Sequence, residues 1–191
     1  MKKNLLISIW FTLATTLLLG IVYPLVVTVL AQVLFPRQAN GELIKVGGKL
    51  VGSQLIGQPF TAPGYFYSRP SAAGAAGYDP TASGGSNLGP TSKALTERVA
   101  ASVKALQPTN PGQAIPADLV TTSGSGLDPD ISPAAAAFQI PRIAKERGLS
   151  EQQVRALVAK HTKGRQFGFL GEPRVNVLEL NLDLDALHPM R

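Results

Sequence analysis

The sequence predicts a single N-terminal transmembrane helix followed by a soluble α+β domain with a small sheet and three or four helices. Three observations lead to this fold class. Residues 5–35 form an uncharged, largely apolar run. Residues 91–106 repeat apolar side chains at helical spacing, and residues 174–184 alternate apolar and polar side chains as a strand does. We therefore expect a membrane anchor over residues 1–36 and a folded domain over residues 37–191.

The apolar run is long enough to cross a bilayer, because about 20 helical residues span a hydrocarbon core of ~30 Å. We assign Trp10, Tyr23 and Pro24 to this anchor, and Pro24 should kink it because proline removes one helical hydrogen bond. Five hydroxyl side chains can bond back to the preceding turn: Ser8, Thr12, Thr15, Thr16 and Thr28. A cleaved signal peptide is the alternative, although its apolar part usually runs only about 7–15 residues.

The charges that flank the anchor indicate its orientation. Lys2 and Lys3 lie next to the apolar run, and only a few residues lie on the N-terminal side of the membrane segment. Basic residues close to a membrane favour the cytoplasmic side, whereas large domains translocate largely regardless of charge. We therefore expect a cytoplasmic N-terminus and an extracytoplasmic domain.

Composition excludes several classes of chemistry. The chain has no cysteine, so disulfides, thiol catalysis, thiolate metal sites and lipidation on cysteine are excluded. Neither His161 nor His188 has the helical partner of a zinc site, so we expect no metal. The basic excess lies mostly between Arg142 and Arg165 with few aromatic neighbours, which is unlike a nucleic-acid interface. A solvated helix face is the simpler interpretation, with anionic lipid as the alternative.

The first half of the predicted domain is rich in glycine. Gly47 and Gly48 separate two short apolar runs and predict a hairpin whose return strand covers residues 50–55. Residues 60–90 form a long Gly/Ala/Ser/Pro-rich loop, which would be unusual if it had no contacts. Its aromatic residues indicate that it packs onto the domain or onto a partner, with residues 65–67 as a short strand or a packed loop segment.

Helices dominate the second half. Residues 91–106 carry an apolar stripe formed by Leu95, Val99, Val103 and Leu106. Residues 115–122 include a short β-prone run, and residues 123–126 predict a tight turn. A helix should follow Ser132 as N-cap and end at Gly148, with Pro141 producing a kink or two short helices. Ser150 and Gln153 form a capping box before the last helix, whose apolar face is formed by Val154, Leu157, Val158 and His161.

No catalytic set is recognisable. The glycine loops at residues 83–89 and 123–126 lack the lysine of a nucleotide-binding P-loop. A serine hydrolase built on Ser125 and His161 would need a nucleophile elbow, which the sequence lacks. Asp128 and Asp130 precede a helix N-terminus, where negative charge is favourable without any catalysis. We therefore expect no catalytic residues.

Five stretches resemble the KdpC family, the C subunit of the bacterial Kdp potassium-transporting P-type ATPase. They are LIGQPF (residues 55–60), YFYSRPSA (65–72), YDPTASGGSNLGP (78–90), DLVTTSGSGLDPDISPAAA (118–136) and GEPRVNVLELN (171–181). The resemblance implies a bacterial inner-membrane complex with a channel-like potassium-binding subunit, an ATP-hydrolysing P-type subunit and a small stabilising peptide. It implies that the C subunit assists assembly and, as a catalytic chaperone, raises the ATP affinity of the hydrolysing subunit.

The resemblance also sets the expected ligands and partners. The chain lacks the D-K-T-G phosphorylation motif, so catalysis should lie in a partner. We expect no tightly bound cofactor, ATP only through the ATPase subunit, and potassium as the transported ion; membrane lipid is an expected partner and nucleic acid is not. Our hypothesis for the partner interface covers Arg69, Ser71, Tyr78, Asp79, Ser86, Asn87, Leu88, Ser123, Ser125 and Asp128. The alternatives are a free-standing anchored binding module and an anchored hydrolase that depends on Ser125.

Overall fold

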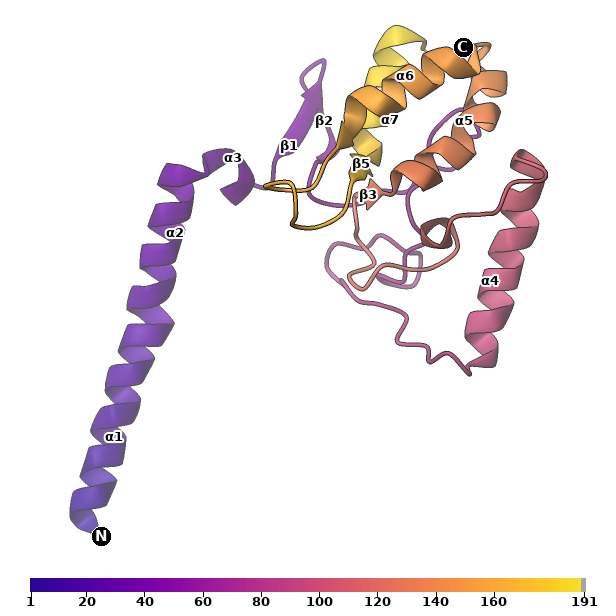
Figure 1. The fold of residues 1–191 in the computed structure, drawn as a ribbon. Helices are drawn as coiled ribbons and strands as arrows, with labels where there is room; N and C mark the ends of the chain where they lie inside the picture. Colours follow the sequence, from indigo (N-terminus) through magenta and orange to yellow (C-terminus); the bar gives the residue numbers. More distant parts are fainter. Residues whose placement is uncertain (190–191) are drawn as a thin grey trace. The chain divides into compact units, whose positions relative to one another are not determined.

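The computed structural model describes residues 1–189 and divides into two units, one of residues 1–43 and one beginning at Ile44 (Figure 1). The first unit is helical. The second contains two small antiparallel sheets and most of the helices. The predicted fold class, one apolar N-terminal helix followed by an α+β domain, is confirmed.

The first unit contains one continuous helix of 33 residues, Lys2–Leu34, whose length and composition make it a candidate membrane span. It comprises α1 (Lys2–Leu17), the π-helical turn η1 (Leu18–Val22) and α2 (Tyr23–Leu34), and the short α3 (Pro36–Ala39) follows. The π turn ends just before Pro24, and the amide of Tyr23 reaches back five residues to the carbonyl of Leu18. The helix thus accommodates the proline by widening its preceding turn.

Three of the predicted hydroxyl bonds within this helix are present. Ser8 donates to the carbonyl of Leu5 at 2.9 Å, and Thr15 donates to the carbonyl of Phe11 at 2.8 Å. Thr28 donates to the carbonyl of Pro24 at 2.7 Å. These bonds satisfy the hydroxyl groups inside the helix itself, as an apolar environment requires.

The predicted hairpin is confirmed as β1 (Leu43–Val46) and β2 (Lys49–Ser53). Gly47 and Gly48 both have positive φ, at +57° and +80°. Two left-handed residues in succession give the turn whose twist matches that of the flanking strands, which explains the Gly-Gly pair.

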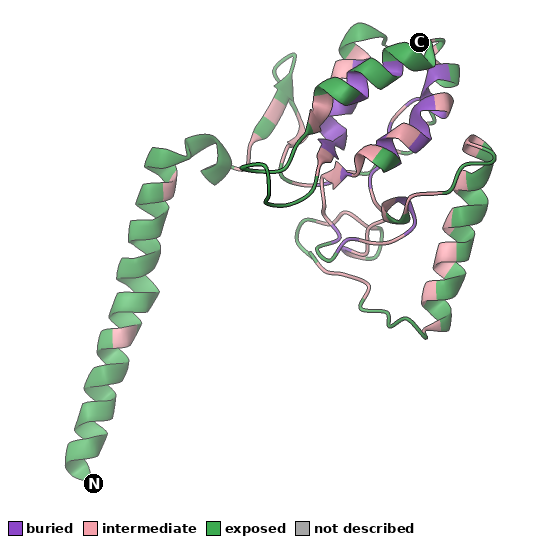
Figure 2. Cartoon of the chain, viewed as in Figure 1, coloured by how far each residue is buried: buried purple, intermediate pink, exposed green. Residues whose placement is uncertain are grey.

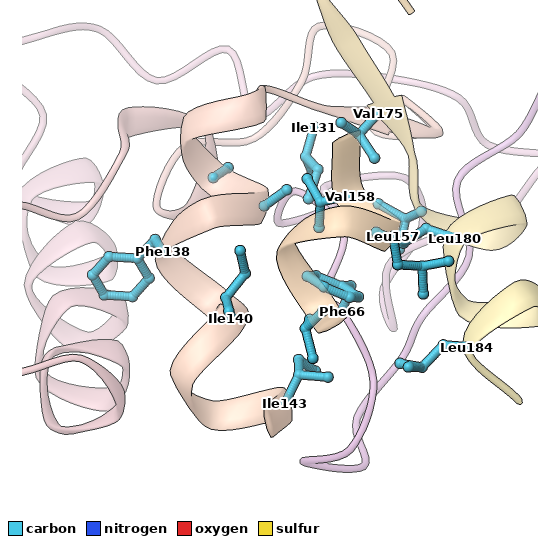
Figure 3. Close-up of a cluster of buried hydrophobic side chains, with 14 of the residues drawn as sticks. Phe66, Ile131, Phe138, Ile140, Ile143, Leu157, Val158, Val175, Leu180 and Leu184 are labelled. Atoms are coloured by element: carbon cyan, nitrogen blue, oxygen red, sulfur yellow. The ribbon is translucent and has the colours of Figure 1, made fainter. Parts of the chain in front are cut away.

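The core of the second unit lies between three helices and a three-stranded antiparallel sheet. The helices are α5 (Pro133–Arg147), α6 (Glu151–His161) and α7 (Val177–Leu187). In the sheet, β5 (Arg174–Asn176) lies between β3 (Asp130–Ile131) and β4 (Thr162–Lys163), and Val175 is opposite both Ile131 and Thr162. Figure 3 shows the buried cluster, to which α5 contributes Ile140 and Ile143, α7 contributes Leu180 and Leu184, and the loop contributes Phe66.

The helix ends follow the sequence signals. Ser132 accepts the amide of Ala135, and Gly148 ends α5 in the left-handed conformation at φ +65°. Ser150 and Gln153 form the predicted capping box, each side chain bonding the other residue's backbone amide. Pro141 lies inside α5, which remains one helix, so the alternative of two short helices is wrong.

The predicted strand over residues 174–184 is wrong beyond its first three residues. The segment forms β5 and then turns into α7, with the side chain of Asn176 capping the helix by accepting the amide of Glu179 at 3.1 Å. Val177, Leu180 and Leu184 stand at helical spacing and are 1% exposed or less. The leucines therefore fit both the two-residue period of a strand and the 3.6-residue period of a helix, and tertiary packing selects the helix.

The β-prone run within residues 115–122 does not form a strand either. Ala117–Leu119 forms the 3₁₀ turn η3, and Leu119 and Val120 are buried there. The side chain of Asp118 accepts the amide of Ser132 at 2.8 Å, which ties this turn to the start of α5. Burial of a compact turn thus outweighs the strand preference of its residues.

The predicted helix over residues 91–106 is confirmed as α4 (Lys93–Leu106), followed by the 3₁₀ turn η2 (Gln107–Thr109). None of its residues is buried, as the mixture of exposed and intermediate positions in Figure 2 shows. Val103, on the predicted stripe, is 37% exposed. The apolar stripe is therefore only partly covered by the rest of the domain.

Residues 60–90 pack onto the domain as loop, as predicted, with no strand at residues 65–67. Phe66 is fully buried in the core. The side-chain amide of Asn181 bonds both backbone groups of Phe66, at 2.9 and 3.0 Å. The amide of Gln139 does the same for Tyr67, at 2.8 and 3.2 Å. Two buried side chains thus replace the strand neighbours that this segment lacks.

Candidate interaction site

Three loop segments that are far apart in the sequence are joined by hydrogen bonds. They are residues 69–79, 83–88 and 122–128, and together we call them the loop platform. The bonds that join them include backbone as well as side-chain groups: the amide of Gly84 donates to the carbonyl of Ser125 at 2.8 Å, and the hydroxyl of Ser83 donates to the same carbonyl at 3.0 Å. The platform contains every residue of the predicted partner interface.

Ser71 organises the first segment. Its hydroxyl donates to the carbonyl of Gly126 at 2.6 Å and accepts the amides of Ala73 at 3.1 Å and Tyr78 at 2.7 Å. One small side chain therefore fixes a loop of eight residues and attaches it to the third segment.

An ion pair crosses the platform as well. Arg69 lies 3.2 Å from the carboxylate of Asp128 and donates to the carbonyl of Thr122 at 3.4 Å. Asp128 in turn accepts the amide of Asp130 at 3.0 Å at the start of β3. The pair thus connects the loops to the central sheet, and Asp128 has a structural partner of its own.

The glycines of the platform allow close backbone approach. A Cβ on Gly126, whose φ is +68°, would lie 2.7 Å from both the amide nitrogen of Ala73 and the carbonyl oxygen of Gly84. A Cβ on Gly85 would lie 3.0 Å from the carbonyl oxygen of Gly124. The segments can meet at this distance only because these side chains are absent.

Two residues of the platform that are not glycine adopt left-handed backbone, Tyr78 at φ +57° and Asn87 at φ +51°. Asparagine tolerates this region, whereas a bulky tyrosine does so at a cost in conformational energy. The phenol of Tyr78 donates to the carbonyl of Arg69 at 2.6 Å, which helps to hold the loop in this conformation. Burial raises the pKa of that phenol, and a bond with Ser68 opposes the shift.

The structure separates the predicted interface residues into two groups. Ser123 is buried, and Arg69, Ser71, Tyr78, Asp79, Ser86 and Asp128 are partly buried and engaged within the domain. Asp79, for example, accepts the hydroxyl and the amide of Thr81, and these bonds lower the pKa of its carboxyl. Asn87, Leu88 and Ser125 are exposed. These three have the most accessible side chains of the predicted interface residues.

The arrangement lacks the geometry of a hydrolase at the serine considered from the sequence. The hydroxyl of Ser125 accepts the amide of Leu127 at 3.1 Å. His161 instead lies 2.9 Å from the carboxylate of Asp183, between α6 and α7. Among residues 1–189, no group of three or more His, Asp or Glu side chains is placed to hold a metal ion.

Sequence reasoning missed several residues that build or extend the site. Thr122, Gly84 and Gly126 contribute contacts to the platform; the sequence placed the two glycines in glycine-rich loops, but a close backbone approach leaves no signal in a single sequence. It also missed Phe167 and Phe169, which are 87% and 70% exposed on the loop between β4 and β5. The sequence did contain a signal for these two residues, because two aromatic residues flank a glycine at residues 167–169.

Comparison with known proteins gives the chain a family. The family model described as "KdpC: K+-transporting ATPase, c chain" matches residues 5–186. The protein named potassium-transporting ATPase KdpC subunit in Koribacter versatilis is 62% identical over 190 residues, covering 100% of this chain and 98% of the relative. The proteins of the same name in Rhodopseudomonas palustris (BisB18) and Methylococcus capsulatus are 56% and 57% identical, covering 97% and 96% of this chain and 99% and 95% of the relatives. The chain, over essentially its whole length, is therefore a member of the KdpC family, the c-chain subunits of the potassium-transporting ATPase complex.

Proposed function

We propose that the chain is a non-catalytic accessory subunit of the ATP-driven potassium uptake complex. Its N-terminal helix anchors it in the bacterial inner membrane with the N-terminus in the cytoplasm, and its domain is extracytoplasmic. The domain docks through the loop platform onto the channel-like subunit, on the side from which potassium enters. In this position it supports assembly of the complex and coupling between its subunits.

The observation that carries this proposal is the prior organisation of the loop platform. Its three segments are held together by Ser71, Gly84 and the Arg69–Asp128 pair, all of them contacts within the chain itself. An interface that is already ordered loses little conformational entropy on binding. Its exposed side chains, Asn87, Leu88 and Ser125, are uncharged and suit a neutral protein surface.

Catalysis and nucleotide binding are assigned to partner subunits. The chain carries no D-K-T-G phosphorylation motif, and a domain outside the cytoplasm cannot touch cytoplasmic ATP. We propose that any effect on the ATP affinity of the hydrolysing subunit, the catalytic-chaperone role, passes through the membrane helix or the channel-like subunit. Potassium is then the transported ion and no cofactor is tightly bound; the small stabilising peptide and membrane lipid are further neighbours, and nucleic acid is not a partner.

Cysteine labelling tests the orientation. The chain lacks cysteine, so Ala76→Cys and Ser125→Cys each introduce one exposed thiol on the platform. An impermeant thiol reagent applied to intact spheroplasts should label both variants, and Lys3→Cys should react only after the membrane is opened. Labelling of the platform only after the membrane is opened would contradict the extracytoplasmic placement and allow direct contact with ATP.

A charge placed on the platform tests docking. Leu88→Glu adds a carboxylate at an exposed residue, and Leu187→Glu makes the same change at the end of α7, where Leu187 is 60% exposed. When the variants are co-expressed with the other subunits, Leu88→Glu should lower the fraction retained on the purified complex and raise the apparent KM for ATP. Leu187→Glu should change neither. Equal retention of the two variants would exclude the platform as the docking surface. Full function without any partner would instead favour the free-standing binding module.

A further inference from the structure

A second exposed feature lies on the loop that joins β4 to β5. Residues 166–170, which we call the aromatic tip, present Phe167, Phe169 and Leu170 with exposed fractions of 87%, 70% and 46%. Single exposed apolar residues are common, whereas exposed apolar side chains that gather in one place are a feature of interaction sites.

The aromatic tip has a defined conformation. Gln166 and Leu170 exchange two backbone hydrogen bonds, each of 2.9 Å. The amides of Gly168 and Phe169 donate to the carbonyls of Arg165 and Gln166 at 3.2 Å. Four amide groups of the tip are thus already satisfied, so the tip can leave water without a buried, unpaired donor among them.

The backbone directs the phenylalanines outward at some conformational cost. Phe167 has φ +52° and Gly168 has φ +82°. A left-handed conformation at a bulky residue costs of the order of 1–3 kcal/mol and tends to occur where function requires it. Burial in the core does not offset this conformational cost, because Phe167 remains almost fully exposed.

The charges around the aromatic tip distinguish a protein partner from a lipid surface. The three cations of the β4–β5 hairpin are all paired: Lys163 with Glu179 at 2.9 Å, Arg165 with Glu172 at 2.7 Å and Arg174 with Asp130 at 3.1 Å. Binding to anionic lipid depends on cations that are available to the phosphates, whereas each of these three lies beside an acid that such a membrane would repel. An apolar tip whose neighbouring cations are all paired with acids matches an uncharged, apolar socket on a protein.

We propose that the aromatic tip is a second docking element, in which Phe167 and Phe169 insert into an apolar socket on another subunit of the complex. The inference rests on the proposed accessory role, but it does not depend on the loop platform. Aromatic anchors that fill pockets carry most of the binding energy in protein interfaces, and a rigid loop loses little entropy on insertion.

Retention on the complex tests this docking element. The variant carries Phe167→Asn and Phe169→Ser, because asparagine tolerates the left-handed backbone at residue 167. Leu187→Ser is the matched control, since it removes an exposed apolar side chain elsewhere. After co-expression and purification, the double variant should be retained at least tenfold less than the control. The thermal midpoint of the isolated full chain in detergent should be unchanged, which separates lost docking from lost folding.

Two results would overturn the inference. One is wild-type retention of the double variant. The other comes from a fluorescence reporter in which Trp10→Phe removes the single tryptophan and Phe169→Trp places a new one on the aromatic tip. Its emission should shift to the blue only when the other subunits are present. Quenching by brominated lipid without those subunits would identify a membrane anchor instead.

The two proposals can fail separately. If the tip variants behave like the wild type, the results of the Leu88→Glu and cysteine-labelling experiments still stand.

Discussion

The side chain of Asn181 on α7 forms two hydrogen bonds with the backbone of Phe66, 115 residues earlier in the chain. Asn181 is 1% exposed and Phe66 is fully buried. An extended segment normally satisfies its amide and carbonyl against a neighbouring strand. Here a buried asparagine takes that role, and this allows loop residues 60–90 to contribute to the core without joining a sheet.

Replacing this asparagine should therefore destabilise the domain. Asn181→Leu keeps the approximate volume but leaves the amide and the carbonyl of Phe66 unpaired, at a cost of about 2–4 kcal/mol for two buried groups. Gln152→Leu, which removes an exposed amide on α6, should change stability by less than about 0.5 kcal/mol. Urea unfolding of the purified full chain compares the two. Equal midpoints would show that the Asn181 bonds contribute little net stability.

Two neighbouring glycines of the loop platform should respond differently to alanine. Gly126→Ala places a Cβ 2.7 Å from backbone atoms of two other segments and adds strain at φ +68°, so we expect a loss of about 2–4 kcal/mol. Gly124→Ala meets nothing within 4 Å and should be nearly neutral or slightly stabilising. Gly126→Ala should therefore unfold at a lower temperature and be retained less on the complex than Gly124→Ala. Similar behaviour would mean that the three segments are not closely packed in solution.

Removing the Ser71 hydroxyl should loosen the platform. Ser71→Ala deprives the amides of Ala73 and Tyr78 of their acceptor, at a cost of about 1–3 kcal/mol. Amide hydrogen exchange at Tyr78 should become faster. Ser83→Ala removes a single, exposed hydroxyl bond and serves as the control, with exchange at Tyr78 close to that of the wild type. Unchanged exchange in Ser71→Ala would assign the rigidity of this loop to other contacts.

The contact between α6 and α7 should weaken in acid. Lys160 and, next, His161 lower the pKa of the Asp183 carboxyl below its ordinary value of 3.8. The folded state therefore binds that proton less tightly than the unfolded chain does. The stabilisation is present above about pH 4 and is lost as the pH falls through the lowered pKa.

Asp183→Asn isolates this effect. Because the carboxylate is partly exposed, the loss at pH 7 should be only about 0.2–1 kcal/mol. In urea unfolding measurements, the difference in free energy of unfolding between this variant and the wild type should shrink as the pH falls from 5 to about 2. Glu97→Gln on α4, which removes an exposed carboxylate paired with Lys93 at 3.6 Å, provides the comparison. A difference that is constant at all pH values would rule out the carboxylate as its source.

Local signals in the sequence predicted much of the fold. The anchor helix, the Gly47–Gly48 hairpin, helix α4 and the caps at Ser132, Gly148 and Ser150 were all identified, because each depends on residues close in sequence. The strand predicted for residues 177–184 was wrong, and the β-prone run within residues 115–122 formed no strand, because both segments depend on distant neighbours. The leucines of α7 fit the period of a strand and that of a helix, and only packing in the core, beside α6 and β5, decides between them.

The sequence by itself determined that the chain has one long apolar helix, an α+β domain, no cysteine chemistry and no recognisable catalytic motif. The five stretches quoted above also determined the family. Only the tertiary structure decided that three glycine-rich segments join into one platform, that Ser123 is buried while Leu88 is exposed, and that Phe167 and Phe169 point into solvent. Composition and periodicity report local preference, whereas exposure and close backbone approach arise from contacts between residues that are far apart in the chain.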